Sequence, residues 1–275
     1  MHGTISSDDY ENFRRFLEES CGIVLGDNKH YLVNSRLNRL MSEHSVMSLG
    51  DLVKRVRSAG NAALKERIVD AMTTNETYWF RDVYPFEVFK SKVLKEYAKG
   101  KKSQARLWSA ACSSGQEPYT LSMAFTEYQM ANPGAMPRDL QIVATDISPS
   151  MLLNAKSGIY DELSIGRGLS DERKKRYFKH TKNLWELRSE LKKRVQFREH
   201  NLLQSYSLLG KFDIIFCRNV LIYFSSESKQ DILSRMAACL NPGGYLFLGA
   251  SESIGNYTDR FEMVRCNPGV IYRLK

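Results

Sequence analysis

Acidic and amide side chains follow short apolar runs of this 275-residue chain, in positions where they could bind a ribose or an adenine. Asp146 ends the run QIVATD, and an acidic side chain at the end of a strand can accept hydrogen bonds from both ribose hydroxyls. Asn201 and Leu202 place an amide beside an apolar side chain, which suits adenine. Each has a simpler explanation: Asp146, or Ser148 in its place, could cap the next helix, and Asn201 could be a turn residue.

The segment FCRNVLIYF is unusual because Arg218 and Asn219 interrupt an apolar run, with Val220 after them. Buried polar groups need partners, and a ligand is one such partner. Tyr223 follows four residues later and could face the same cleft. A core tyrosine with a satisfied hydroxyl explains it equally well.

The segment SAACSSGQEPYTL supplies small residues and Gly115, which allow a ligand to approach the backbone, before a helix that begins near Glu117 and Pro118. It lacks the GxGxxG pattern, so an ordinary strand-to-helix turn remains an alternative.

Residues 73–82, TTNETYWFRD, set Asn75, Thr77 and Arg81 among three consecutive aromatic residues. Core aromatics beside a surface cation that packs its stem would give the same pattern.

These residues need a scaffold that brings strand ends together. From Arg106 onward, short apolar runs alternate with helical patterns, which predicts a doubly wound α/β domain with a mostly parallel sheet. The final segment FEMVRCNPGVIYRLK predicts an antiparallel C-terminal hairpin. Ligands bind such sheets at the carboxyl ends of the strands.

The domain organisation follows from the change of pattern along the chain. Residues 1–82 predict a small all-α domain whose first helix is capped by Ser6 or Ser7, and residues 83–105 a connecting helix from about Tyr84 to Tyr97 with the polar run KGKKSQ. Residues 106–275 form the α/β domain, with a charged insertion at about 159–199 that should fold as a small β-subdomain.

Composition narrows the class of protein. The hydrophobic fraction of 43% and the charged fraction of 26% are ordinary for a folded domain. No apolar run reaches the ~18 residues that a membrane span needs, and no apolar signal core begins the chain, so we expect a cytoplasmic protein without membrane insertion. The five cysteines and five histidines show no metal-ligand spacing, so no metal is expected.

The net charge of +9 is unevenly distributed. Residues 1–80 carry ten basic and eleven acidic side chains, whereas residues 158–200 carry twelve basic and seven acidic ones. A solvated face accounts for such a run, and attraction to an acidic protein or to RNA are the alternatives. We expect a monomer that binds no nucleic acid.

Taken together, TTNETYWFR, SAACSSGQEPYTL, ATDIS, HNLL, FCRNVLIYF and PGGYLFLGASES resemble, in order, the motifs of the bacterial chemotaxis receptor methyltransferases, the CheR family. The resemblance covers nearly the whole chain and implies a class I S-adenosylmethionine-dependent methyltransferase fold, with S-adenosylhomocysteine as product. It implies that Arg81 and Tyr223 line the methyl-transfer site. It also implies a set of cofactor contacts: Asn75, Thr77, Arg81, Glu117, Asp146, Asn201, Leu202, Asn219 and Val220. A basic second helix with Lys29, Arg36 and Arg39 would face the acidic methylation region of a receptor.

The implied reaction forms γ-methyl esters on glutamates of methyl-accepting chemoreceptors. A nucleic-acid or small-molecule methyltransferase is the alternative enzyme, but the chain lacks an NPPY-like loop. A non-catalytic nucleotide-sensing adaptor is another alternative, although Asp146 and Arg81 are both present.

One segment departs from relatives that bind a tether peptide at the receptor's C-terminus. Such relatives have a glycine-rich turn in the inserted subdomain, whereas RYFKHTKNLWELRSEL contains no glycine. A tight turn with positive φ would then fall on Asn183, or a different loop would replace it, and we expect methylation to be independent of a tether peptide.

Overall fold

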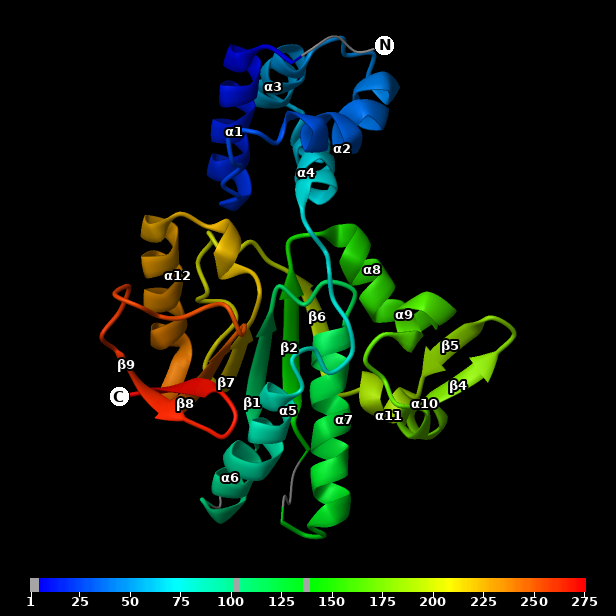
Figure 1. The fold of residues 1–275 in the computed structure, drawn as a ribbon, viewed down its shortest axis with the longest axis vertical. Coiled ribbons are helices and arrows are strands. Elements are labelled where there is room, and N and C mark those ends of the chain that lie inside the picture. Colours follow the sequence, from blue (N-terminus) through cyan, green and yellow to red (C-terminus); the bar gives the residue numbers. More distant parts are fainter. Residues whose placement is uncertain (1–4, 101–103, 136–138) are drawn as a thin grey trace.

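A computed structural model describes residues 5–100, 104–135 and 139–275 (Figure 1). A small helical domain overhangs one end of a larger α/β domain, and a small sheet projects from the side of the latter. The predicted class I methyltransferase architecture, with its all-α domain and inserted β-subdomain, is confirmed.

The helical domain has its own apolar core, in which Phe13, Leu17, Leu37 and Ile68 are fully buried. Ser6 caps the first helix, since its hydroxyl accepts a 3.1 Å hydrogen bond from the backbone N–H of Asp9. The helices are α1 (Ser7–Cys21), α2 (His30–Glu43), α3 (Leu49–Arg57) and α4 (Ala62–Met72).

The segment after α4 belongs to the α/β domain in its packing. The bundle ends at Met72, whereas the boundary was expected at residue 82. Trp79 and Phe80 lie in the core of the α/β domain, and this burial draws residues 73–83 onto the sheet. A continuous helix then runs through α5 (Tyr84–Val88), a π-helical turn (Phe89–Leu94) and α6 (Lys95–Lys99). Residues 101–103 of the polar run KGKKSQ lie outside the described residues.

The main sheet has the strand order β6-β2-β1-β7-β8-β10-β9 among the described residues. Its strands from β6 to β8 are parallel, and β10 is antiparallel to both β8 and β9, which confirms the C-terminal hairpin. The strands are β1 (Arg106–Ala110), β2 (Gln141–Asp146), β6 (Val195–Glu199), β7 (Phe212–Cys217), β8 (Leu240–Leu248), β9 (Phe261–Arg265) and β10 (Val270–Leu274).

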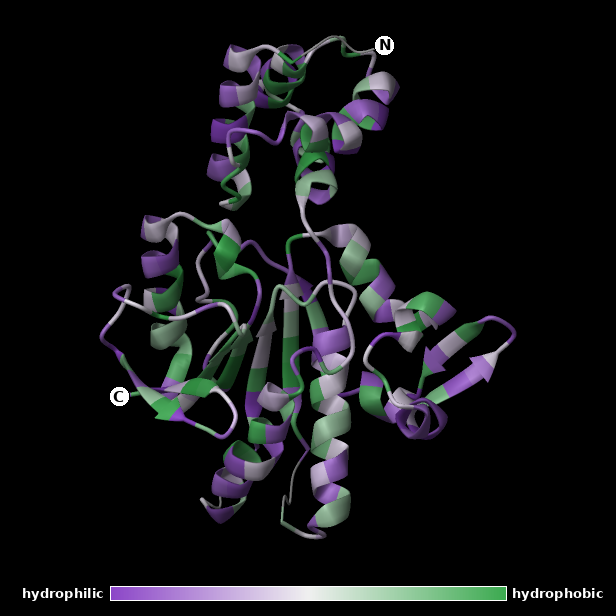
Figure 2. Cartoon of the chain, viewed as in Figure 1, coloured by the Kyte–Doolittle hydropathy of each residue, from purple (hydrophilic) through white to green (hydrophobic). Residues whose placement is uncertain are grey.

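Both faces of this sheet are covered, as the apolar colour of its strands suggests (Figure 2). Successive residues of β1 point to opposite faces, so Leu107 packs with the α5–α6 helix and α7 (Gln116–Ala131), whereas Trp108 packs with α12 (Ser226–Cys239). The helix α8 (Pro149–Ser157) lies against β2 and β6.

The insertion forms an antiparallel sheet of order β3-β5-β4. Its elements are β3 (Ile159–Asp161), α9 (Glu162–Gly166), α10 (Asp171–Tyr177), β4 (Phe178–Thr181), β5 (Leu184–Leu187) and α11 (Ser189–Lys192). Two details correct the sequence analysis. Residues 195–199 form β6 of the main sheet, where Val195 and Phe197 pack on buried side chains despite their charged neighbours. The positive φ of the β4–β5 turn falls on Lys182, at 57°, and not on Asn183.

The helical domain is fixed over the strand ends by hydrogen bonds from two of its helices. At the end of α1, the Ser20 carbonyl accepts from Asn201 Nδ2 at 2.8 Å, and the Val24 N–H donates to the Tyr223 carbonyl at 2.8 Å. In α4, the Asp70 carboxylate accepts from the hydroxyls of Ser148 and Ser150 beside β2. The domain therefore forms one wall above the sheet.

In the part of the chain that is described, no helix is both long and apolar enough to cross a membrane.

Two glycines with similar left-handed backbones allow the packing of the insertion to be tested. Gly168 (φ +90°) lies against the segment 73–83, where an added Cβ would be 2.0 Å from the Trp79 carbonyl oxygen, whereas Gly60 (φ +87°) has nothing within 4 Å. We expect Gly60→Ala to lower the free energy of unfolding by about 1–2 kcal/mol, the cost of the left-handed conformation. Gly168→Ala should cost an additional ~1–3 kcal/mol because backbone must move. Urea unfolding measures both, and equal losses would contradict the packing.

Candidate active site

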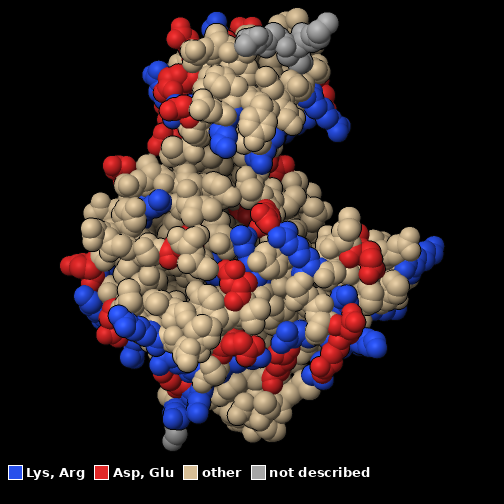
Figure 3. Space-filling model, viewed as in Figure 1, with Lys and Arg blue, Asp and Glu red and all other residues tan. Residues whose placement is uncertain are grey.

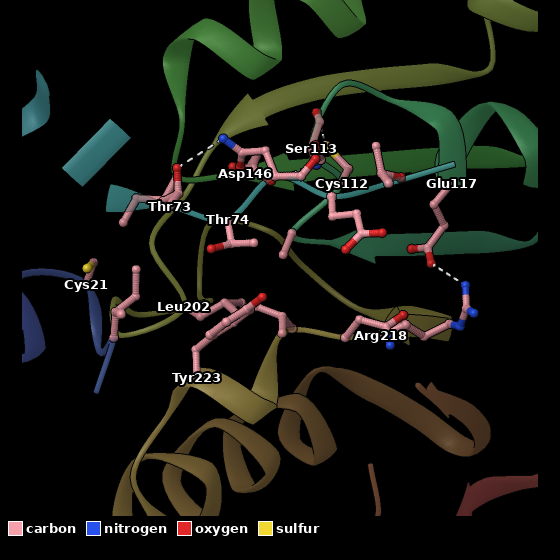
Figure 4. Close-up of a pocket in the computed structure, with 18 of the residues that line it drawn as sticks. Cys21, Thr73, Thr74, Cys112, Ser113, Glu117, Asp146, Leu202, Arg218 and Tyr223 are labelled. Carbon is pink, nitrogen blue, oxygen red and sulfur yellow. Dashed lines mark hydrogen bonds and ion pairs between the residues drawn. The ribbon is translucent and has the colours of Figure 1, made fainter. Parts of the chain in front are cut away.

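A cleft opens at the carboxyl ends of β1, β2 and β7, the place predicted from the doubly wound pattern. The segment 73–81 and the end of α1, with Cys21 and Ile23, complete its walls. Figure 4 shows Glu117 and Arg218 facing each other at one end of the cleft and Cys21 at the other. The cleft brings together the nine residues predicted to contact a cofactor, together with Tyr223.

Arg218 is the buried centre of one end of the cleft, and its side chain is 1% exposed. It donates to Glu117 Oε2 at 3.0 Å and, through Nη2, to Asp82 Oδ2 and the Arg81 carbonyl, both at 2.8 Å. Glu117 in turn accepts from the Ser109 hydroxyl of β1 at 2.7 Å. One guanidinium therefore joins β7, α7 and the 73–83 segment. The sequence marked Arg218 as unusual but did not place it or Asp82 in the site.

The loop held by Arg218 has an uncommon backbone. Phe80, Asp82 and Val83 have φ values of 51°, 65° and 53°, and a β-branched residue such as Val83 rarely adopts such values. Conformations of this kind persist where the surroundings impose them, and they cluster at functional sites. Here they turn the backbone on both sides of Arg81, whose side chain lines the cleft.

Asp146 is buried at the end of β2 and shapes the neighbouring loop. Its Oδ2 accepts from the Ser113 N–H at 2.7 Å and its Oδ1 from the Ser148 N–H at 2.9 Å. Burial raises the pKa of Asp146, and the backbone hydrogen bonds oppose that shift. The cap of α8 is Ser148, whose hydroxyl accepts from the Met151 N–H, so Asp146 is not the helix cap that the sequence left open.

The end of β6 contributes His200, Asn201 and Leu202. The Asn201 side chain is occupied within the chain, since it donates to the Ser20 carbonyl and accepts from the Leu203 N–H at 3.0 Å. Leu202 is buried and offers an apolar surface. Burial and the charge of Arg235 lower the pKa of His200.

Glu252 organises the end of β7 and was missed by the sequence analysis. Its carboxylate accepts from the N–H groups of Asn219 at 2.6 Å, Val220 at 3.0 Å and Gly249 at 2.8 Å. This holds Asn219 at a positive φ of 58° in the cleft wall. An acidic residue after an apolar run, in LGASES, was a usable signal of the same kind as Asp146.

The three basic residues expected to face a receptor do not line the cleft. Arg36 donates to the carbonyls of Met72 and Thr73 at 2.7 and 2.9 Å, so it anchors the end of α4. Arg39 is exposed and pairs with Glu43, and Lys29 is exposed just before α2. Among the described residues, Lys29 and Arg39 are therefore exposed to solvent, whereas Arg36 is bonded to the backbone.

Comparison with known proteins agrees with this geometry. Residues 75–270 match the family model described as CheR methyltransferase, SAM binding domain, and residues 8–73 match its all-alpha domain. The chain belongs to the CheR methyltransferase family. It is a methyltransferase of chemotaxis that uses S-adenosylmethionine.

Several curated relatives extend over nearly the whole chain. The chemotaxis protein methyltransferase Cher2 of Pseudomonas putida is 56% identical over 97% of this chain and 98% of its own length. Chemotaxis protein methyltransferase 1 of Pseudomonas aeruginosa is 58% identical over the same shares. The chemotaxis protein methyltransferase of Salmonella typhimurium is 35% identical over 92% of this chain and 87% of its own length.

The cleft chemistry fits this cofactor. The carboxylates of Glu117 and Asp146 suit its positively charged groups and its ribose hydroxyls, and Leu202 and Val220 offer apolar contact for adenine. Among the described residues, Arg218 Nε is buried without a hydrogen-bond partner, and Arg218 is one of the residues that line the same cleft. Such an atom is a donor that an acceptor on a ligand could satisfy. The described residues contain no group of three or more His, Cys, Asp and Glu placed to hold a metal ion.

The buried arginine gives a stability prediction. Arg218→Ala leaves the partly buried Glu117 and Asp82 without their cation, so it should lower the free energy of unfolding by about 3–5 kcal/mol. Arg57→Ala removes the exposed partner of Glu19 and should cost at most ~1 kcal/mol. Chemical denaturation of both variants checks this, and similar losses would show that Arg218 does not hold the site together.

Proposed function

We propose that the chain transfers the methyl group of S-adenosylmethionine to glutamate carboxylates of a chemoreceptor's cytoplasmic domain, forming γ-methyl esters. The observation that carries the proposal is Arg81, a cation held in the cleft wall on a loop that Arg218 fixes. A planar guanidinium binds a carboxylate through two parallel hydrogen bonds. Tyr223 lines the same cleft.

The proposed chemistry needs no general base. A glutamate carboxylate is already ionised near pH 7, because its reference pKa is about 4.3. The cofactor supplies an activated methyl group on its sulfonium. The chain's own residues orient the carboxylate and exclude water, and orientation of this kind can contribute on the order of 7–11 kcal/mol. Arg81 must steer the carboxylate without holding it too tightly, since a strong grip would stabilise the ground state.

The cofactor contacts are proposed from the lining of the cleft. The predicted residues Asn75, Thr77, Glu117, Asp146, Asn201, Leu202, Asn219 and Val220 all line it with Arg81. Since the Asn201 side chain is already bonded to Ser20 and Leu203, we assign its contact to the backbone. Besides facing the ligand, Asp146 shapes the neighbouring loop, as Glu252 does at the end of β7.

Receptor docking is proposed for the helical domain. Lys29 is exposed at the N-terminal end of α2, and Arg39 is exposed within the helix. Both could attract an acidic methylation region. Arg36 supports them indirectly, by tying α2 to the end of α4. We place the monomeric enzyme in the cytoplasm, where such receptor domains lie.

The product distinguishes this proposal from other methyl acceptors. After incubation with labelled S-adenosylmethionine and a receptor cytoplasmic fragment, mild alkali should release the label as methanol, because an ester hydrolyses and a methylated lysine or arginine does not.

Arg81→Lys keeps the charge but loses the planar fork, so turnover should fall roughly ten- to a hundredfold while the circular dichroism spectrum is unchanged. Alkali-stable label would refute the ester, and normal turnover would remove Arg81 from the reaction.

Independence of a tether peptide remains a prediction about the inserted subdomain. Its β4–β5 turn is glycine-free, with Lys182 in the left-handed conformation, and His180 stacks on Trp185 at a centroid distance of 4.2 Å. We expect a peptide from a receptor's C-terminus to show no binding by calorimetry and a trimmed receptor to be methylated at the normal rate. Micromolar binding would show that the outer strand β4 accepts a peptide strand.

A further inference from the structure

A second arginine packs on the same tyrosine ring as Arg81, and this ring lines the cleft. Arg167, in the inserted subdomain, lies with its guanidinium carbon 4.3 Å from the centroid of the Tyr78 ring, and that of Arg81 lies 5.4 Å from the same centroid. Figure 3 shows basic and acidic atoms side by side below the overhanging helical domain, where the surface is hollowed. The two cations therefore share one aromatic contact.

The position of Arg167 is fixed by the backbone of both segments. Its carbonyl accepts from the Trp79 N–H at 3.2 Å, and the Trp79 indole donates to the Ser164 carbonyl at 3.0 Å. Gly168 allows this approach, since a Cβ there would meet the Trp79 carbonyl. These contacts involve no Arg167 side-chain atom, so the side chain can be exchanged without releasing the insertion.

The Arg167 side chain already forms an ion pair with a carboxylate of the chain itself. Glu76 Oε1 lies 2.7 Å from Arg167 Nη2, and the two side chains are 57% and 55% exposed. The hydrogen bond from Arg167 lowers the pKa of Glu76, and the charges of Arg167 and Arg81 act in the same direction. Exposed pairs of this kind are weak and exchange readily for another carboxylate.

We propose that Arg167 is a specificity-determining residue, which binds a second acidic side chain of the substrate while Arg81 orients the glutamate that is methylated, and that Glu76 is an internal competitor for Arg167. The proposal rests on the proposed function, because it assumes a glutamate substrate in an acidic helix. Side chains three or four residues apart on a helix lie about 5–6 Å apart, so neighbouring acids can reach neighbouring cations. The pair would select glutamates that have an acidic residue one turn away.

Substitutions of Glu76 and of Arg167 should have opposite effects on KM for the receptor fragment. Arg167→Gln should raise KM for the receptor fragment about two- to fivefold with kcat unchanged, as expected for loss of one exposed charge pair. Glu76→Gln should lower KM by a similar factor, because it frees Arg167. In the Arg167→Gln background, Glu76→Gln should have no further effect. The affinity for S-adenosylmethionine, measured by calorimetry, should not change.

A second exposed ion pair, similar to Arg167–Glu76 but remote from the cleft, controls for the change in net charge. Arg57 and Glu19 lie 2.9 Å apart with side chains 51% and 63% exposed, and they do not line the cleft. Arg57→Gln and Glu19→Gln should leave KM unchanged. Glu76→Gln that raises KM or leaves it unchanged, or Arg167→Gln that alters kcat or cofactor affinity in place of KM, would overturn the proposal. Failure of the proposed function is separate, because the wild-type chain would then form no alkali-labile ester.

Discussion

The site depends on one buried cation. Arg218 would be costly to bury alone, and the chain meets this cost with two carboxylates and a backbone carbonyl from elements far apart in sequence. Because Glu117 also accepts from Ser109, the arrangement links β1, β7, α7 and the segment 73–83. These contacts of Arg218 add little to the net stability of the fold. Their main effect is to fix the position of Arg81 relative to the strand ends. A Lys in its place would offer no planar fork to join three partners.

The same principle recurs at other strand ends, with backbone donors in place of a cation. Asp146 accepts from Ser113 and Ser148, and Glu252 accepts from Asn219 and Val220. Each carboxylate satisfies N–H groups in a loop that would otherwise lack regular partners, and each holds a non-glycine residue at positive φ in the cleft wall. The cleft is therefore shaped before any ligand enters. This suits a reaction whose rate depends on orientation, since a preformed site loses little freedom on binding.

Much of this arrangement could be predicted from the sequence, because the signals were local. Alternating apolar runs located the strands, and the groups after them located the cleft. The strand β6 was assigned to the insertion because only Val195 and Phe197 are apolar in a charged run, and pairing with β2 decides its place. The partners of Arg218 could not be predicted, since Asp82 and Glu117 reach it only through the fold. The anchoring role of Arg36 could not be predicted for the same reason, because the sequence of a helix does not indicate that one of its arginines donates to the carbonyls of Met72 and Thr73.

The junction of the helical domain with the sheet connects the proposed docking helix to the cleft. The end of α1 lines the cleft through Cys21 and Ile23, and the same turn bonds to Asn201 and to the backbone of Tyr223. An added Cβ at Gly22 would lie 2.3 Å from the Phe224 ring, so the two domains meet at full packing density there. A receptor docked on α2, as proposed, would therefore be held by a domain that also forms a wall of the cleft. Movement of the helical domain would change the shape of the cleft along with the position of the proposed docking helix, and the close contact at Gly22 limits that movement.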